Sequence, residues 1–474
     1  MDVRIERDLL GEKAVPAHAY YGIHTLRALE NFQISSQKIG QWTHFIRALG
    51  FVKKAAAQTN HYFQLIDHKK LAAIEFATDQ LIQQAESWET AFPVDIYQGG
   101  AGTSVNMNCN EVIANIGLEF MGEKKGDYRF LHPNDDVNKS QSTNDVYPTA
   151  LRISLYLKLD DLLSALFELS KVIEHKADMF KHALKMGRTQ LQDAVPMTVG
   201  QELRAFATLL NEDYKLIDEL RKRLLEINLG ATAIGTGVNT PKDYAHHVTA
   251  RLQKLTGLAL RGADDYIEAT SDCGVFILIS SILKRLACKL SKISNDLRLL
   301  SSGPRTGLGE IRLPELQAGS SIMPAKVNPV IPEVVNQIAF KVIGNDLTVS
   351  MAAEAGQLQL NAMEPIIAVS LNESIELLIE GIQSLNKKCF SGLQVNEKHA
   401  YDMMMKSVGI ITLLEPFLGH ALCDAIGKTC IEENKTIQEV VLSKGLMIEE
   451  QLQEVFSYEN LISDVKKEGV IAVA

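Results

Sequence analysis

Hydrophobic residues recur every three or four positions over long stretches in the middle of the chain, the spacing of one apolar face of an α-helix. The clearest run alternates between these steps through Phe276, Ile279, Leu283, Leu286, Leu290, Ile293, Leu297 and Leu300. A second run comprises Leu155, Leu159, Leu162, Leu166, Leu169 and Ile173, and a third comprises Leu210, Tyr214, Ile217, Leu220, Leu224 and Ile227. These patterns predict long helices that pack in a bundle.

Five long helices are expected in this central region. The first follows Pro148, after which the next proline is Pro196, and the others are expected near 199–227, 266–300, 333–353 and 365–388. At 1.5 Å per residue, the longest would span about 50 Å. Helices of this length with a wide apolar face usually pack against partners, so we expect oligomerisation through the central region.

The regions on either side of the bundle have a different character. Residues 1–145 are predicted to form a mixed, mainly helical N-terminal domain, with helical runs near 44–60 and 69–91. The bundle domain would occupy residues 146–393, and a small helical C-terminal domain residues 394–474. The sequence therefore predicts a mainly α protein of three domains.

Composition limits the class of protein. The 474 residues are 46% hydrophobic and 22% charged, as in globular proteins, and the formal net charge of −10 argues against a nucleic-acid partner. The amino terminus lacks the apolar core of a signal peptide, and no apolar run reaches membrane-spanning length. The six cysteines form no C-x-x-C pair or zinc-type cluster, so reduced thiols and a cytoplasmic location are expected.

One stretch, 319–337, differs from an ordinary connector. Prolines at 324, 329 and 332 prevent a regular helix through its first two-thirds. Apolar residues there alternate with Ser320, Ser321, Lys326 and Asn328. A long, partly apolar loop with two hydroxyls, an ammonium and an amide usually serves a ligand; the alternative is an ordered loop packed on a core.

Three further polar loops lie beside predicted helix ends, at 102–108, 140–145 and 187–193. The four loops are rich in neutral donors, namely Thr103, Ser142, Thr143, Asn144, Thr189, Gln190 and Asn328, and only Lys326 and Arg188 add positive charge. Such a set suits recognition of a small carboxylate. Taken singly, each Ser or Thr is more often a helix cap than a ligand, and it is the presence of four such loops that favours a binding site. Walker A, dinucleotide-binding, H-E-x-x-H and G-x-S-x-G motifs are all absent from the sequence.

The loop Gly319-Ser-Ser-Ile-Met-Pro-Ala-Lys-Val-Asn-Pro329 resembles the signature loop of the aspartase/fumarase superfamily. The other three loops resemble its remaining active-site regions, in the same order along essentially the whole chain. The segments 20–30, 98–104 and 187–196, with Ala325 in the signature loop, are most similar to the aspartase branch. This resemblance implies reversible deamination of L-aspartate to fumarate and ammonia, by a homotetramer with a helical core and active sites shared among subunits.

The resemblance also implies a role for each polar residue. Ser320 would be the general base that removes a proton from Cβ, giving an aci-carboxylate intermediate. The α-carboxylate would be bound by Lys326, Asn328 and Thr189; the β-carboxylate by Thr103, Ser142, Thr143 and Ser321; and the α-amino group would lie near Asn144 and Gln190. No cofactor or metal is expected for the chemistry, although a divalent metal such as Mg²⁺ can activate members of the family.

Gln190 favours deamination over dehydration. Fumarases typically have a histidine at this position, paired with a glutamate at the position of Glu333. Loss of hydroxide needs a proton donor, whereas a primary ammonium leaves as neutral ammonia, and an amide cannot serve as a general acid. The alternatives are a class II fumarate hydratase and, less favoured, a catalytically silent helical scaffold.

Two other features leave their roles open. The segment His132-Pro-Asn-Asp-Asp136 resembles a secondary surface site of fumarases more than the usual aspartase sequence. His24 and Arg27 fit substrate selection and a structural role about equally well.

Overall fold

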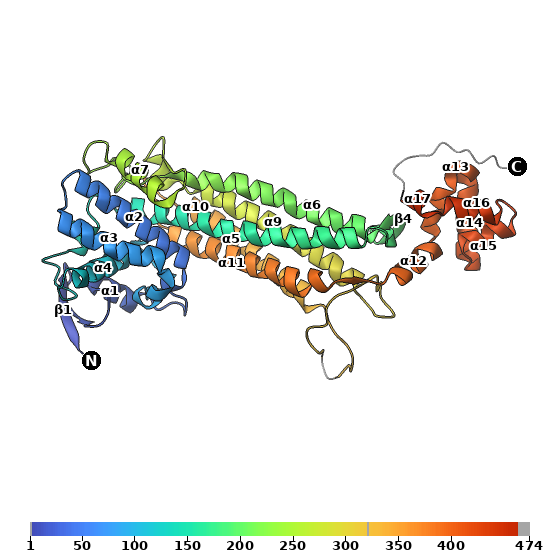
Figure 1. The fold of residues 1–474 in the computed structure, drawn as a ribbon, viewed down its shortest axis with the longest axis horizontal. Coiled ribbons are helices and arrows are strands. Elements are labelled where there is room, and N and C mark those ends of the chain that lie inside the picture. Colours follow the sequence, from blue (N-terminus) through green and yellow to red (C-terminus); the bar gives the residue numbers. More distant parts are fainter. Residues whose placement is uncertain (1, 320–321, 463–474) are drawn as a thin grey trace. The chain divides into compact units, whose positions relative to one another are not determined.

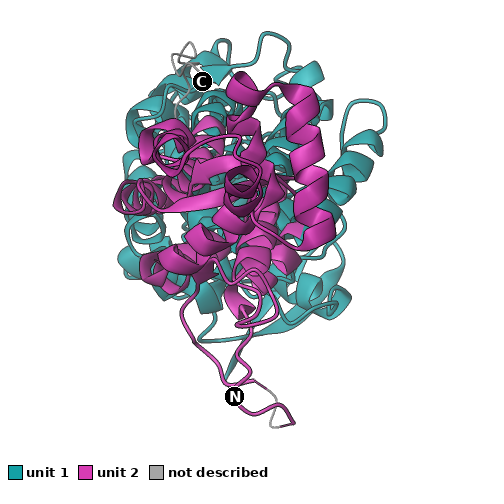
Figure 2. Ribbon diagram, turned by 90° about the vertical axis from the view of Figure 1, so that its right-hand side faces the viewer, with its two compact units in different colours: residues 1–164, 214–287, 340–379 teal, residues 165–213, 288–339, 380–474 magenta. Residues whose placement is uncertain are grey.

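The computed structural model describes residues 2–319 and 322–462, and it is built mainly from helices (Figure 1). Ser320 and Ser321 lie outside the described residues. Contacts group the chain into two compact units, coloured separately in Figure 2: unit 1 contains 1–164, 214–287 and 340–379, and unit 2 contains 165–213, 288–339 and 380–474. The division into three domains expected from the sequence stays a prediction.

The five long helices are present, which confirms the mainly α fold. They are α5 (Thr143–Met179), α6 (Val199–Leu220), α9 (Gly274–Leu300), α10 (Val330–Glu354) and α11 (Glu364–Lys388). Every residue of the 3-4 alternation in α9 is buried, and so are the six apolar residues singled out in α5. The apolar periodicity therefore identified the packed faces of both helices.

Polar contacts join neighbouring long helices within each unit. In unit 1, Asp346 of α10 accepts hydrogen bonds from Ser280 and Lys284 of α9, at 2.9 and 2.6 Å. In unit 2, Asn211 of α6 accepts from Ser170 of α5, at 2.7 Å. These bonds pair the polar side chains that lie beside the apolar faces of the helices, as buried polar groups require.

Three helix boundaries differ from the expected ones. The first long helix does not follow Pro148 but begins at Thr143, with Pro148 in its second turn. The predicted helix near 199–227 ends at Leu220 and continues as a 3₁₀ turn over Arg221–Leu225. The predicted helix near 266–300 begins only at Gly274, where the Asp272 carboxylate accepts a hydrogen bond from the Gly274 backbone N–H at 2.8 Å. Such a side-chain bond to a free N–H group marks a helix start that apolar periodicity does not reveal.

Unit 1 also contains the N-terminal elements. They are β1 (Val3–Asp8), β2 (Gly11–Pro16), α1 (Ile23–Asn31), α2 (Thr43–Tyr62), α3 (His68–Gln83) and α4 (Thr103–Phe120), with α7 (Tyr244–Thr256), α8 (Glu268–Ser271), β5 (Glu226–Ile227) and β6 (Arg261–Gly262) from later in the chain. The strands β1 and β2 form an antiparallel hairpin, and β5 pairs with β6 in parallel.

Unit 2 adds two short sheets and the last helices. The strands β3 (Leu184–Thr189) and β4 (Gln192–Thr198) form an antiparallel hairpin, and β7 (Ile311–Arg312) pairs with β8 (Gln394–Val395). Short helices follow: α12 (Glu397–Lys406), α13 (Glu415–Leu418), α14 (His420–Glu433), α15 (Ile437–Ser443), α16 (Glu449–Val455) and α17 (Tyr458–Leu461). No helix among the described residues is long and apolar enough to cross a bilayer.

Candidate active site

The turn before α4 requires unusual backbone angles. Gly100, Ala101 and Gly102 have consecutive positive φ angles of 92°, 55° and 87°. A Cβ on Gly102 would lie 2.2 Å from a ring atom of Tyr147, so only glycine fits there. The turn starts α4 at Thr103, whose hydroxyl donates to the Gly100 carbonyl at 2.7 Å. The backbone N–H of Thr103 also donates to the Gly100 carbonyl, at 2.9 Å, and the N–H groups of Val105 and Asn106 donate to the Gly102 carbonyl, both at 3.1 Å.

The start of α5 is capped by its own side chains. The Ser142 hydroxyl oxygen accepts from the Asn144 backbone N–H at 3.2 Å, and the Asp145 carboxylate accepts from the Ser142 backbone N–H at 2.9 Å. The expectation that such a serine could be a helix cap is therefore met at Ser142. Because its oxygen serves as the acceptor, the hydroxyl hydrogen remains available to a ligand.

The two helix N-termini are directly connected. The Asn106 amide, in the first turn of α4, donates to the Thr143 hydroxyl oxygen at 3.0 Å. Each helix N-terminus carries a partial positive charge, so two adjacent N-termini favour an anion. We call this group of Thr103, Ser142, Thr143 and Asn144 the α4–α5 site.

Asn144 is held so that its side-chain oxygen can accept a hydrogen bond. Its Nδ2 donates to the Ala233 carbonyl at 2.8 Å, and Oδ1 has no donor within residues 2–319 and 322–462. The backbone carbonyl of Asn144 cannot make the usual helix hydrogen bond, because Pro148, four residues later, has no N–H. This carbonyl accepts instead from Asn228 Nδ2, at 3.0 Å. An amide oxygen fixed in this way suits an ammonium group.

Thr189 and Gln190 lie at the tip of a hairpin instead of in the loop expected from the sequence. Thr189 pairs with Gln192, and the two central residues, Gln190 and Leu191, have φ angles of 53° and 62°. Positive φ at both positions defines a type I′ turn, which normally selects glycine or asparagine. A turn built from glutamine and leucine is strained, and such strain is concentrated at functional sites.

A buried ion cluster supports this hairpin. The Glu310 carboxylate, which is fully buried, lies 2.9 Å from Lys185 Nζ and 2.7 Å from Arg188 Nη1. Lys185 also contacts Glu202 at 2.7 Å. Glu310 stands at the start of the loop that leads to 319, so the cluster ties the base of this loop to the strand carrying Thr189.

The two described sides of the signature loop, 318–319 and 326–327, contact each other. Ala318 and Val327 form an antiparallel bridge, and a Cβ on Gly319 would lie 2.1 Å from the Lys326 carbonyl oxygen. Lys326 is exposed and Asn328 is half-buried. Ser320 and Ser321, the proposed base and a proposed β-carboxylate ligand, are outside the described residues, and their roles stay predictions.

The described site residues fall into two groups. Thr103, Ser142, Thr143 and Asn144 belong to unit 1, where the structure brings them together. Thr189, Gln190, Lys326 and Asn328 belong to unit 2, the first two on the hairpin and the last two in the signature loop. The unit 1 group is held at helix ends and the Thr189–Gln190 pair at a hairpin turn, whereas Lys326 and Asn328 lie in the loop before α10.

Three other predicted features have structural partners. Arg27 makes a two-pronged ion pair with Asp8, at 2.6 and 2.7 Å, which supports its structural role. In the 132–136 turn, Asp136 accepts from the His132 backbone N–H and from Lys70, at 2.8 and 2.7 Å. Glu333 lies 3.8 Å from Arg298. Each carboxylate therefore has a basic side chain as its partner.

Sequence reasoning missed Lys53, a fully buried lysine behind the α4–α5 site. The sequence feature that could have identified Lys53 is its spacing: it lies four residues after the buried Leu49 and three before the buried Ala56, on the apolar face of α2. Lysines are almost never fully buried unless paired, so this register marks a functional candidate. Burial lowers the pKa of Lys53 to about 8 and raises the pKa of the neighbouring Asp145 to about 6.

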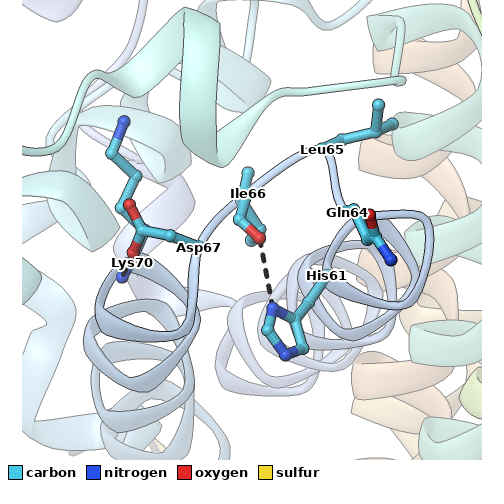
Figure 3. A pocket seen from close by; sticks show the side chains of 6 residues that line it. All are labelled: His61, Gln64, Leu65, Ile66, Asp67 and Lys70. Atoms are coloured by element: carbon cyan, nitrogen blue, oxygen red, sulfur yellow. Dashed lines mark hydrogen bonds between the residues drawn. The ribbon is translucent and has the colours of Figure 1, made fainter.

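The structure also has a pocket apart from these residues, between α2 and α3. It is lined by His61, Gln64, Leu65, Ile66, Asp67 and Lys70 (Figure 3). The His61 ring faces the Ile66 carbonyl, with Nδ1 at 3.1 Å. Within the described ranges, no group of three or more His, Cys, Asp or Glu side chains is placed to hold a metal ion.

Comparison with known proteins agrees with these features. A family model described as lyase matches residues 11–344, and one described as fumarase C C-terminus matches residues 410–463. The protein named aspartate ammonia-lyase from Escherichia coli (strain K12) is 56% identical over 466 residues, which are 98% of this chain and 97% of the relative.

Solved structures share the fold. One described as fumarate lyase:delta crystallin from Brucella melitensis, bound to cobalt, has a TM-score of 0.94 and 48% identity, covering 97% of this chain and 99% of the other. A recombinant class II fumarase from Schistosoma mansoni has a TM-score of 0.92 and 32% identity, covering 98% and 100%. The chain belongs to the aspartase/fumarase superfamily of lyases, which confirms the resemblance recognised in its loops.

Proposed function

We propose that this chain is a carbon–nitrogen lyase that converts L-aspartate reversibly to fumarate and ammonia. The observation that carries the proposal is the pair of adjacent helix N-termini in the α4–α5 site, where two hydroxyl groups keep their hydrogens for an anion. The relative named aspartate ammonia-lyase, 56% identical over nearly the whole chain, supports the choice of substrate.

The chemistry places the largest demand on the β-carboxylate. When Ser320 removes the Cβ proton, negative charge builds on this carboxylate to give an aci-carboxylate dianion. Donors already oriented toward the developing charge lower the barrier. Ser142 and Thr143 would donate from the α4–α5 site together with Ser321, and Thr103 would join them after turning its hydroxyl from Gly100.

The remaining groups orient the substrate and its leaving group. Lys326, Asn328 and Thr189 would bind the α-carboxylate, and the free Asn144 oxygen would accept from the α-ammonium, near Gln190. Collapse of the aci-carboxylate then breaks the C–N bond and releases ammonia, while the abstracted proton remains on Ser320. Ser320 can act as a base where a closed loop excludes water and Lys326 with backbone N–H groups stabilises the alkoxide.

Purified protein incubated separately with L-aspartate and L-malate tests this choice. Fumarate is expected from aspartate and not from malate, because Gln190 provides no general acid for hydroxide loss. Chelation of divalent metals should leave this activity in place, with added Mg²⁺ acting only as an activator. Fumarate from malate alone would identify a hydratase, and fumarate from neither would support a scaffold.

We propose further that the chain works as a homotetramer with shared active sites. On α10, the apolar side chains of Phe340, Leu347 and Met351 are each more than 60% exposed in the single chain and are spaced seven and four residues apart. Such a stripe fits coverage by helices of further copies. Sedimentation should give the mass of four chains, and a stable monomer at micromolar concentration would contradict the assembly.

A cytoplasmic location belongs to the same proposal. All six cysteines are free thiols, and five of them are buried. Unpaired thiols of this kind are typical of reducing compartments.

A further inference from the structure

Lys53 connects the apolar interior of unit 1 to the α4–α5 site. Its side chain, on α2, is completely buried. The ammonium donates to Asn106 Oδ1 at 2.7 Å, to Asn138 Oδ1 at 3.0 Å and to Gln141 Oε1 at 3.0 Å. All three of its hydrogens therefore have acceptors, as a buried ammonium requires.

These bonds determine which way the Asn106 amide points. A lysine ammonium has no acceptor, so Asn106 must present its oxygen to Lys53 and its nitrogen to the other side. The two hydrogens on Nδ2 are then directed to Asn138 Oδ1, at 3.2 Å, and to Thr143 Oγ1, at 3.0 Å. Thr143 Oγ1 becomes an acceptor toward Asn106, and its own hydrogen is left for a ligand.

We infer that Lys53 is a positioning residue: through Asn106, it fixes the Thr143 hydroxyl as a hydrogen-bond donor to the substrate's second carboxylate. This inference rests on the proposed function of the α4–α5 site. The positive charge of Lys53 also lies behind the two helix N-termini and adds to their attraction for an anion, most strongly where water is excluded.

The charge of Lys53 depends on few titratable neighbours. Those that act on it are Cys109 of α4 and Asp145 of α5. The Asp145 carboxylate accepts backbone N–H groups of Ser142, Gly230 and Thr232, at 2.9, 3.0 and 3.0 Å. Because burial lowers the pKa of Lys53 to about 8, its positive charge is lost as the pH rises through that value.

Four variants of the full-length protein test the relay. Lys53→Met removes the charge, Thr143→Val removes the hydroxyl, and Asn106→Asp keeps an acceptor for Lys53 but forces Thr143 to donate toward residue 106. The matched control is Lys54→Met, on the next position of α2, where the lysine pairs with Asp79 at 2.7 Å instead.

The first three variants should each lower kcat/KM for L-aspartate by about 10- to 100-fold, the effect of losing a hydrogen bond to a charged group. The decrease should be mainly in kcat, because the charge on this carboxylate is greatest in the transition state. Adding Thr143→Val to Asn106→Asp should cause little further loss, since both remove the same donor. Lys54→Met should retain wild-type values.

Inhibition constants separate positioning from a general structural role. Succinate carries the second carboxylate, and L-alanine lacks it but keeps the α-carboxylate and amino group. The three variants should weaken inhibition by succinate and leave inhibition by L-alanine unchanged. In the wild type, succinate should also inhibit more weakly as the pH rises from 7 to 9, and in Lys53→Met this pH dependence should be reduced.

Equal weakening of both inhibitors, or wild-type kinetics in Lys53→Met, would overturn the inference. If Lys53→Met does not fold, the Asn106→Asp variant tests the inference in its place. This variant keeps the Lys53 ammonium and gives it a carboxylate acceptor at position 106. A wild-type protein that binds succinate but does not deaminate aspartate would refute the proposed function alone, and the succinate measurements would still test the relay.

Discussion

Replacing Ser320 by alanine is expected to lower kcat for L-aspartate by about 10²- to 10⁴-fold, the usual contribution of a general base. Binding should change little, because the substrate carboxylates are assigned to other residues, including Lys326 and the α4–α5 site. Fumarate formation gives kcat, and the inhibition constant of succinate gives the binding.

The succinate measurement is also the control for folding of this variant. A Ser320→Ala protein with normal succinate inhibition and most of the wild-type turnover would remove Ser320 from the role of base. Loss of both turnover and succinate binding would instead point to a collapsed loop and would contradict the assigned division of roles.

The second large effect is expected at Glu310, where glutamine should lower the free energy of unfolding by about 3 kcal/mol or more, the range found when a buried ion pair loses one partner. The carboxylate lies between Lys185 and Arg188 and is fully buried. Its removal leaves two cations without their shared counter-charge. Urea unfolding, monitored by the loss of helical circular dichroism, measures the change.

Glu202→Gln is the matched control for this variant. Glu202 also pairs with Lys185, at 2.7 Å, but its side chain is 22% exposed, so water can replace the lost partner. Its expected effect is about 1 kcal/mol or less. Equal losses in the two variants would mean that burial of Glu310 adds nothing. Turnover should fall only in Glu310→Gln, because the cluster also holds the strand that carries Thr189.

Helices were the part of the fold that the sequence predicted well. Apolar spacing in α5 and α9 corresponds residue by residue to the buried faces, because long bundle helices repeat one environment many times. The β3–β4 hairpin escaped prediction because its turn is formed by Gln190 and Leu191, which lack the glycine or asparagine that usually marks a type I′ turn.

The sequence predicted which kinds of side chain form the candidate site, whereas the hydrogen bonds between them were seen only in the structure. Neutral donors beside helix ends indicated a carboxylate, but nothing in the sequence joins Asn106 to Thr143, which are 37 positions apart. Lys53 was hidden for a similar reason: its three acceptors come from α4 and from the segment before α5. The roles of Ser320 and Ser321 still rest on the resemblance.

The tight turn before α4 has a consequence for how this protein can evolve. Because a side chain at 102 would collide with the Tyr147 ring, at 2.2 Å from the first added carbon, the identities of these two positions are linked. At Gly99, by contrast, an added carbon would meet only the Phe32 ring at 3.9 Å, an ordinary contact. Descendants of this sequence can thus vary position 99 alone, whereas position 102 is held to glycine twice over, by the ring at 147 and by its own φ of 87°, so loss of the ring would not by itself open it to change.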